Sequence, residues 1–389
     1  MACGELIVRN CRPFNWPEDA EPISISIRNG IISRVGESDP EIGSTEELDA
    51  EGRIVTPGFI DVHVQGAGGG DVLDGTSEAL RAISRTCARF GVTSFLATTV
   101  FRPNGDNRHL KVAAENVGRD LGGANLLGIH LEGPFISPQK RGMIQPDCIC
   151  SPSKGILDRI LGLSDGTLKI MTIAPELEGS LGVIERLRDG GILPSLGHTN
   201  ASYEETLKGI RAGISHVTHL FNAMTSFHHR NPGPLLAIFE SEDLDVQLIT
   251  DGVHLHPMVL RWAFNLIGPE RSITITDGVQ AMGLPDGRYI YNGVEYESRN
   301  GTARYGDGTL IGTSLGLSQM LLRLMRFTGC PLDVAVRTVT ENPARAIGME
   351  DRKGRIEVGK DGDLVILDFD LSVWATVVGG RIVYRKGGG

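Results

Sequence analysis

The sequence predicts an α/β fold: a (β/α)8 TIM-type barrel with a small β-sandwich domain formed by both chain termini. Two observations predict it. Eight short apolar, β-rich runs occupy the middle of the chain, most of them followed by a helix-like segment, and short β-type runs occupy both ends. Eight such units within about 290 residues are typical of the barrel. A doubly wound open sheet is the competing fold, but the count of eight and the polar residues at several strand ends favour the barrel.

The central strands are predicted from their enrichment in β-branched and other apolar residues. Helices are predicted after them where good helix formers follow, as in residues 77–90, 180–190, 202–213 and 258–267. The eight predicted strands are residues 59–64, 94–99, 126–133, 169–176, 192–198, 215–221, 246–252 and 272–278.

The two chain ends share one character. Short β-type runs, such as ISISIRNG at 23–30 and DLVILD at 363–368, are separated by Gly, Asn, Pro and acidic residues, the pattern of a small β-meander. Neither end alone has enough strands for a stable domain. We therefore predict that residues 1–56 and 351–389 pair into the small domain, with residues 57–350 forming the barrel between them.

Composition excludes several classes of function. The net charge is −10 and the sequence pI is about 5.5, which argues against nucleic acid or an anionic membrane surface as a partner. No apolar run approaches the roughly 20 residues of a spanning helix, and the N-terminus lacks the pattern of a signal peptide. The six cysteines are scattered, which favours free thiols in a reducing compartment. These features predict a cytoplasmic protein.

A barrel carries its active site at the carboxyl ends of its strands, and polar residues gather at these predicted ends. Glu132, His198 and His219 offer one carboxylate and two imidazoles, an open three-ligand site for a catalytic divalent ion. Zinc is the favoured ion, with iron, cobalt and manganese as alternatives. Such an ion lowers the pKa of bound water and polarises a carbonyl. Asp277, at the last strand end, is placed to move a proton between water and a leaving group.

Each of these residues also has an ordinary structural interpretation. A single buried histidine is more often a hydrogen-bonded core residue, and we expect this of His216, three residues from His219 and therefore on the opposite strand face. His130 shares a face with Glu132 and is expected to support it. Asp251, like Asp277, precedes a glycine, as in an ordinary turn. The metal interpretation is favoured because the polar residues converge on one end of the barrel.

Seven motifs resemble one family in sequence and order. The segments PGFIDVHVQG, HLEGPFISPQKRG, LGHT, THLFNAM, HHRNPG, DGVH and TDG are similar to those of the N-acetylglucosamine-6-phosphate deacetylases of the amidohydrolase superfamily. The resemblance covers nearly the whole chain. It implies a homodimeric barrel enzyme of amino-sugar catabolism that hydrolyses the acetamide of a phosphorylated amino sugar, N-acetyl-D-glucosamine 6-phosphate, to acetate and D-glucosamine 6-phosphate.

The resemblance also implies roles for individual residues. It gives the metal ligands as Glu132, His198 and His219, and the catalytic acid and base as Asp277. It places Asn222 and Ala223 at the substrate phosphate, and it has Arg230 reach that phosphate from the neighbouring subunit. The remaining implied substrate contacts are Met143 and His254, with Leu310, Ile311 and Gly312 in a loop that closes over the sugar.

Two positions depart from the family pattern. The first strand carries His63 and Gln65 where some members have two histidines and a second metal, so we expect one metal ion with His63 nearby. Ile144 occupies a position where members often have a histidine or glutamine that donates to the acetyl carbonyl. Either Gln145 replaces that donor through a local shift, or the metal alone stabilises the oxyanion.

Three alternatives remain open at this stage. The first is that the substrate is another N-acetylhexosamine 6-phosphate, such as the galactosamine isomer. The residues that would discriminate between the two sugars lie around Met143 to Gln145 and His254. A cyclic-amide hydrolase of the same superfamily is less favoured, because residues 169–176 end without the lysine that such enzymes commonly use. A non-catalytic sugar-phosphate binding protein is the alternative from a different class, and it is disfavoured because the metal ligands and Asp277 are all present.

Overall fold

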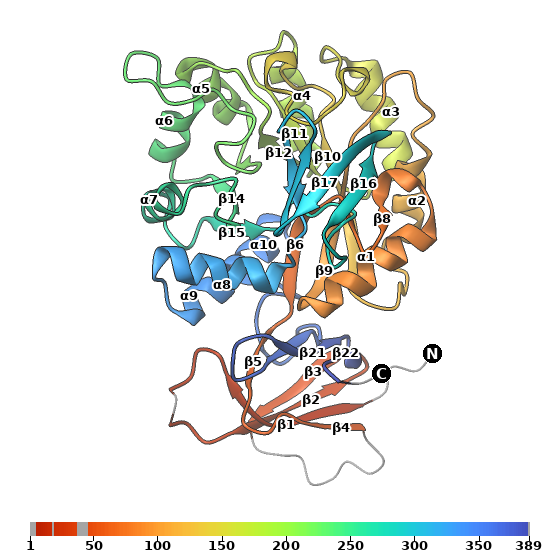
Figure 1. Ribbon diagram of the computed structural model, residues 1–389, viewed down its shortest axis with the longest axis vertical. Coiled ribbons are helices and arrows are strands. Elements are labelled where there is room, and N and C mark those ends of the chain that lie inside the picture. The colour runs from red at the N-terminus through yellow and green to blue at the C-terminus, as the bar shows by residue number, and fades with distance from the viewer. Residues whose placement is uncertain (1–4, 18, 37–45, 388–389) are drawn as a thin grey trace.

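The computed structural model describes residues 5–17, 19–36 and 46–387, and it contains the predicted barrel. Eight parallel strands form one sheet in the order β15-β14-β13-β12-β11-β10-β9-β6 (Figure 1). The first and last strands meet through a parallel bridge between Val64 and Gly278, and the Thr276 hydroxyl donates to Asp61 at 2.6 Å. The strands are β6 (Phe59–Val64), β9 (Val92–Thr99), β10 (Asn125–Glu132), β11 (Leu168–Ile173), β12 (Leu193–Leu196), β13 (His216–Val217), β14 (Asp245–Ile249) and β15 (Ser272–Ile275).

Helices surround this sheet and bury their apolar faces against it. In α5, Ser202 caps the N-terminus and Glu205 completes a capping box, which satisfies backbone donors that the first turn leaves free. The eight helices that alternate with the strands are α1 (Ser77–Arg89), α2 (Arg108–Asn116), α3 (Lys154–Ser164), α4 (Ser180–Asp189), α5 (Tyr203–Ala212), α6 (Gly233–Glu240), α7 (Pro257–Ile267) and α8 (Leu317–Thr328). Two further helices, α9 (Leu332–Val339) and α10 (Glu341–Ala346), follow α8.

An antiparallel sheet that the sequence analysis did not predict lies between β15 and α8. It contains β16 (Gly287–Tyr291), β17 (Val294–Arg299), β18 (Thr302–Tyr305) and β19 (Leu310–Thr313) in that order. Its first two turns are Asn-Gly pairs with both residues at positive φ, the geometry of a type I′ hairpin turn. The expectation of a closing loop at Leu310 to Gly312 is therefore wrong, because these residues form the strand β19.

The small domain is built from both chain termini, as predicted. Its strands pair in the order β22-β21-β20-β5-β1-β2-β3, with β4 also beside β1. The meander prediction holds for β1 to β3, whereas β4 and β5 both pair with β1 in parallel. The exact domain boundaries, between residues 56 and 57 and between residues 350 and 351, remain a prediction. The strands are β1 (Leu6–Pro13), β2 (Ile23–Arg28), β3 (Ile31–Gly36), β4 (Glu46–Asp49), β5 (Ile54–Pro57), β20 (Leu364–Leu367), β21 (Val373–Val378) and β22 (Arg381–Arg385).

Two further predictions concern composition. Five cysteines are free, at positions 11, 87, 148, 150 and 330, and Cys3 lies outside the described residues. Among the helices that the structure describes, none has the length and hydropathy needed to cross a membrane.

Candidate active site

The three predicted metal ligands meet at the carboxyl end of the barrel. Glu132 is the last residue of β10, and His198 and His219 each stand two residues beyond a strand end. One carboxylate oxygen, Oε1 of Glu132, lies 2.9 Å from Nε2 of His198 and 2.9 Å from Nε2 of His219. All three side chains are at least 95% buried. The predicted cluster of one carboxylate and two imidazoles is therefore assembled by three different strands.

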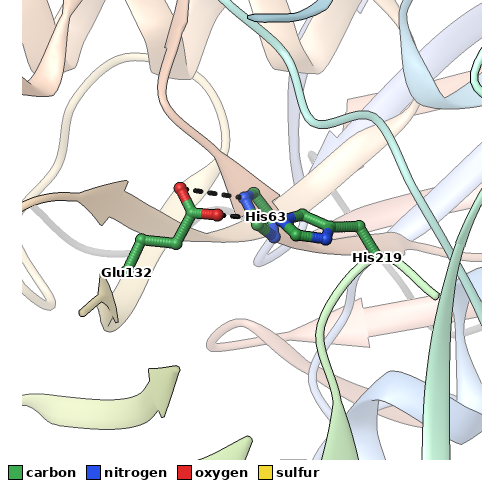
Figure 2. Close-up of side chains that lie close together, drawn as sticks. All are labelled: His63, Glu132 and His219. Carbon is green, nitrogen blue, oxygen red and sulfur yellow. Dashed lines mark hydrogen bonds and ion pairs between the residues drawn. The ribbon is translucent and has the colours of Figure 1, made fainter. Parts of the chain in front are cut away.

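His63 and Asp277 complete the group. Nε2 of His63, on β6, lies 3.8 Å from Glu132 Oε2 and 3.3 Å from Asp277 Oδ1. Figure 2 shows Glu132 facing the rings of His63 and His219. Each of these three residues offers one atom that could bind a metal ion, and the three atoms lie within 4.8 Å of one another. Asp277 also accepts a hydrogen bond of 3.0 Å from the Gln65 amide. His63, which was predicted to lie near the metal, is thus close to both Glu132 and Asp277.

The backbone is left-handed at three of these positions. The φ angles are 49° at His198, 27° at His219 and 47° at Asp277, a region that residues other than glycine seldom adopt. Each such residue costs about 1–3 kcal/mol and persists where the surrounding structure fixes it. These turns break the alternation of strand side chains and direct all three groups into the mouth of the barrel.

Hydrogen bonds from the other ring nitrogens orient His198 and His63. Nδ1 of His198 donates to the Lys140 carbonyl at 2.9 Å, which orients the ring so that Nε2 points at Glu132 Oε1. Nδ1 of His63 lies 3.0 Å from Oε1 of Gln247, and the same oxygen accepts a 3.3 Å hydrogen bond from the His219 backbone N–H. Contacts of this kind commonly set the tautomer and orientation of metal-binding histidines. Gln247 was missed by the sequence analysis, although a glutamine within the apolar run VQLITDG was an available signal.

The charges at the site stabilise one another. Burial alone would raise the pKa of Glu132, but hydrogen bonds from His198 and His219 hold it well below its ordinary value. Burial alone would lower the pKa of His219, but the Glu132 carboxylate raises it overall. The buried atoms His63 Nε2 and Glu132 Oε2 have no hydrogen-bond partner among the described residues. A carboxylate oxygen and an imidazole nitrogen that are buried without hydrogen-bond partners are suitable ligand atoms for a divalent metal ion.

A cavity of about 120 Å³ opens above this cluster. It is lined by most of the residues predicted to bind substrate, and Gly142, which the sequence analysis did not single out, also lines it. Gly312 does not line the cavity; a Cβ at this glycine would stand 2.3 Å from the Asp277 carbonyl oxygen. The lining residues are Glu132, Gly142, Met143, His198, His219, Asn222, Ala223, His254, Asp277, Leu310 and Ile311.

Arg230 lies outside the cavity of its own chain. It is exposed, in the loop before α6, and its guanidinium contacts His229 at 2.7 Å. Ile144 also lies outside, in a buried apolar cluster with Val100, Ile136 and Cys148. The Gln145 side chain donates weakly to the Met143 carbonyl at 3.4 Å and does not line the cavity. The shift that would bring Gln145 into the site is absent from this structure.

His216 is a hydrogen-bonded core residue, as predicted, but it does not face away from the site. Its Nδ1 bonds Ser195 at 2.8 Å, and Ser195 and Thr218 are 2.6 Å apart. Thr218 in turn bonds Thr172 at 2.9 Å, and Thr172 bonds Nε2 of His130 at 2.9 Å. His216 is therefore part of a polar layer inside the barrel, because the left-handed turn at His219 brings residues three apart onto one side. His130 supports the site from the same layer, with its ring centroid 4.7 Å from that of His63.

The comparisons with known proteins agree with this geometry. A model of the amidohydrolase family matches residues 54–383, so the class that the fold and the site define is that of the amidohydrolases. The N-acetylglucosamine-6-phosphate deacetylase of Bacillus subtilis (strain 168) is 37% identical over 92% of this chain and 92% of its own length. The chain belongs to the family of these deacetylases.

Two further relatives are informative about substrate. The N-acetylgalactosamine-6-phosphate deacetylase of Escherichia coli O157:H7 is 33% identical over 94% of this chain and 95% of its own length. The solved structure of a mutant N-acetyl-D-glucosamine-6-phosphate deacetylase from Mycobacterium smegmatis, in complex with N-acetyl-D-glucosamine-6-phosphate, has a TM-score of 0.88. It is 32% identical, and the match covers 98% of this chain and 99% of that chain.

Proposed function

We propose that this chain is a metal-dependent hydrolase that cleaves the acetamide of N-acetyl-D-glucosamine 6-phosphate to D-glucosamine 6-phosphate and acetate. The observation that carries the proposal is the cluster of Glu132, His198 and His219 with Asp277 beside it, at the mouth of a barrel and under a small cavity. Glu132, His198 and His219 would hold one divalent ion, most simply zinc, which supplies a water of lowered pKa and polarises the acetyl carbonyl.

Asp277 is proposed as the residue that moves protons. Its carboxylate accepts a proton from the attacking water and delivers it to the amide nitrogen, because an amide anion is a very poor leaving group. The Gln65 amide donates to Oδ1 of Asp277 at 3.0 Å, and Nε2 of His63 lies 3.3 Å from the same oxygen. Asn222 and Ala223 are proposed to contact the phosphate, and Met143, His254, Leu310 and Ile311 to surround the sugar. Gly312 would act by letting β19 approach Asp277 closely.

We propose a single metal ion per site. The first strand carries Gln65 in place of a second histidine, and the Gln65 amide N–H donates to Asp277, so this strand offers one imidazole rather than two. Nε2 of His63 lies 3.8 Å from Glu132 Oε2 and has no hydrogen-bond partner among the described residues. Metal analysis of purified protein tests this directly: one ion per chain is expected, and two ions with His63 and Gln65 both coordinating would contradict it.

The substrate assignment is tested by acetate release. Purified protein, loaded with zinc, iron, cobalt or manganese in turn, is assayed on N-acetylglucosamine 6-phosphate and on the galactosamine isomer. Faster turnover of the glucosamine compound supports the proposal. The galactosamine isomer is the second candidate because the Escherichia coli relative carries that name at 33% identity. Release from neither compound would contradict both.

We propose a homodimer in which Arg230 reaches the site of the partner subunit. Arg230 is exposed and outside its own cavity, and a guanidinium suits a phosphate because its donors bind two oxygens at once. Helix α7, which packs on α6 through Trp262 and Phe239, exposes one apolar face, and such a face fits burial against a second copy. That face contains Met258, Val259, Trp262 and Leu266, of which Met258 and Trp262 are 62% and 51% exposed.

Mixed dimers test this arrangement. Arg230→Ala should raise KM for the phosphorylated sugar more than it lowers kcat, with little change for a sugar without phosphate. An equal mixture of Arg230→Ala and Asp277→Asn chains, unfolded and refolded together, should regain activity at low substrate concentration. About a quarter of all sites would then combine an intact Asp277 with an intact Arg230. No recovery in mixtures shown to contain mixed dimers would place Arg230 outside the partner's site.

We also infer a cytoplasmic enzyme. The five described cysteines are free thiols, the form that a reducing compartment maintains. The small-molecule substrate carries the phosphate that Arg230 and Asn222 are proposed to bind. The acidic balance of the chain, with a net charge of −10, disfavours nucleic acid and anionic membrane surfaces as partners. Fractionation of cells that express a tagged chain checks the compartment.

A further inference from the structure

Asp251 and His254 form a buried pair at the cavity that the proposed chemistry does not use. Both follow β14, and Oδ2 of Asp251 lies 2.7 Å from Nδ1 of His254. The side chains are 1% and 4% exposed. His254 lines the cavity, whereas Asp251 stands behind it. The carboxylate therefore meets the imidazole on the side away from the substrate space.

The turn holds this carboxylate in one orientation. Oδ1 of Asp251 accepts hydrogen bonds from the backbone N–H groups of Val253 and His254, each at 2.8 Å. Gly252 makes the turn possible with a φ of +78°, and a Cβ there would stand 2.8 Å from the Phe327 ring. With Oδ1 occupied by two backbone donors, Oδ2 is the oxygen left to face the imidazole.

The pair determines which ring nitrogen carries the proton. Burial would raise the pKa of Asp251, but the hydrogen bond and charge of His254, with the two backbone donors, lower it overall. An ionised carboxylate only accepts hydrogen bonds, so Nδ1 of His254 must be protonated. In the neutral ring, Nε2 is then an acceptor, and it is the nitrogen available to a molecule in the cavity.

We propose that Asp251 is a positioning residue that fixes the Nδ1–H tautomer of His254, so that Nε2 accepts a hydrogen bond from a donor of the amino-sugar substrate. That donor is a ring hydroxyl or the acetamide N–H. The proposal rests on the proposed function for the identity of the substrate, but not for the state of the ring. It assigns to Asp251 a part in substrate recognition without contact to the substrate.

Nitrogen-15 NMR of the histidine rings in the zinc-loaded enzyme tests the tautomer. The His254 signals are identified by their loss in His254→Gln. The wild type should show a protonated Nδ1 and a bare Nε2. In Asp251→Asn the two backbone donors retain the amide oxygen, so the amide N–H₂ group faces Nδ1 and the tautomer should reverse. A wild-type ring protonated only at Nε2, or an unchanged tautomer in Asp251→Asn, would overturn the proposal. Asp245→Asn, at the opposite end of β14, removes the same charge and should leave the signals unchanged.

Kinetics test the link to substrate. Asp251→Asn should raise KM for N-acetylglucosamine 6-phosphate about tenfold with a smaller change in kcat and unchanged metal content, the effect of one lost hydrogen bond. On the deoxy analogue that lacks the recognised hydroxyl, wild type and variant should have equal KM. If every deoxy analogue keeps the tenfold difference, the recognised donor is the acetamide N–H. An unchanged KM, or a parallel loss of kcat and metal, would refute recognition through His254. Absence of acetate release by the wild type would refute the proposed function, while the NMR measurement would still decide the tautomer.

Discussion

Two polar layers inside the barrel differ in how far their hydrogen bonds are satisfied and in backbone conformation. The upper layer contains His63, Glu132, His198, His219 and Asp277, and the lower layer contains His130, Thr172, Ser195, His216 and Thr218. Both are buried and both are rich in histidine. In the lower layer the side chains form a continuous chain of hydrogen bonds, with Nε2 of His216 as its one unpartnered atom among the described residues. The upper layer instead combines unpartnered donor atoms with left-handed backbone.

Burial acts to lower the pKa of His130, His216 and His219 alike, but its effect is outweighed at His219. Burial lowers the pKa of His216 to about 3 and holds that of His130 well below its ordinary value. For His219 the Glu132 carboxylate outweighs burial and raises the pKa. Residue type and burial are therefore poor guides to function here. The informative signals are the neighbouring carboxylate and the donor atoms without partners.

The largest expected difference between the layers concerns metal binding. His219→Ala should lose both the metal and the activity, because it removes one of three ligands. His216→Ala, the matched change one layer below, should lower the free energy of unfolding and keep the metal. Metal analysis of both purified variants, with acetate release, decides the matter. A His219→Ala protein that retains stoichiometric metal would break the comparison.

A smaller effect is expected from Asp277→Asn. Asparagine has nearly the same shape, so the variant should fold, keep its metal and bind the sugar phosphate. It cannot accept the proton from water, and kcat should fall by at least about 10²-fold, the lower range for a positioned acid or base. The measurement is kcat of the metal-loaded variant. A value within a few-fold of the wild type would mean that Asp277 only shapes the turn before Gly278.

The smallest expected effect is a pH dependence of stability that comes from the lower layer. The pKa of His216 is lowered from 6.5 to about 3 in the folded chain, so the unfolded chain binds more protons between these values. The stabilisation is fully present above pH 6.5 and is lost as pH falls toward 3. Its slope is at most about 1.4 kcal/mol per pH unit for one proton.

Urea unfolding of metal-free wild type and His216→Gln at pH 7, 6 and 5 measures this slope. The variant should be less stable at pH 7 but lose less stability on acidification, because its side chain does not titrate. His130, whose pKa is also lowered, should contribute a similar dependence that remains in the variant. Equal slopes in the two proteins would show that His216 is not held neutral by burial.

The barrel and most of the site could be predicted from the sequence because each depends on local pattern plus one topological rule. Apolar runs indicate the eight strands, and the rule that barrel sites lie at carboxyl strand ends selects Glu132, His198, His219 and Asp277. The direction of His216 could not be predicted, because strand alternation fails at the left-handed turn of His219. Gln247 stood out as a glutamine within an apolar run, but its contacts could not be predicted, since they join residues from separate strands.

The antiparallel sheet β16–β19 had a signal that the sequence analysis did not use. Asn292-Gly293 and Asn300-Gly301 separate runs in which polar and apolar residues alternate, the strongest short-range indication of hairpins. The sheet is joined to the catalytic end of the barrel, where the Thr313 N–H donates to the Asp277 carbonyl at 2.8 Å. One wall of the cavity, at Leu310 and Ile311, therefore belongs to an element outside the eight strand–helix units.

The small domain imposes an order on biosynthesis. Its central strand β5 pairs with β20, and the Thr56 hydroxyl donates to the Val365 carbonyl across 309 residues. At translation rates of about 5–20 residues per second, β5 leaves the ribosome roughly 15–60 s before its partner exists. The hairpins of β1 to β3 can form at once, but the open edge of β5 waits for the whole barrel to be made. We expect this edge to be the part of the nascent chain most exposed to pairing with other chains, and most in need of a chaperone.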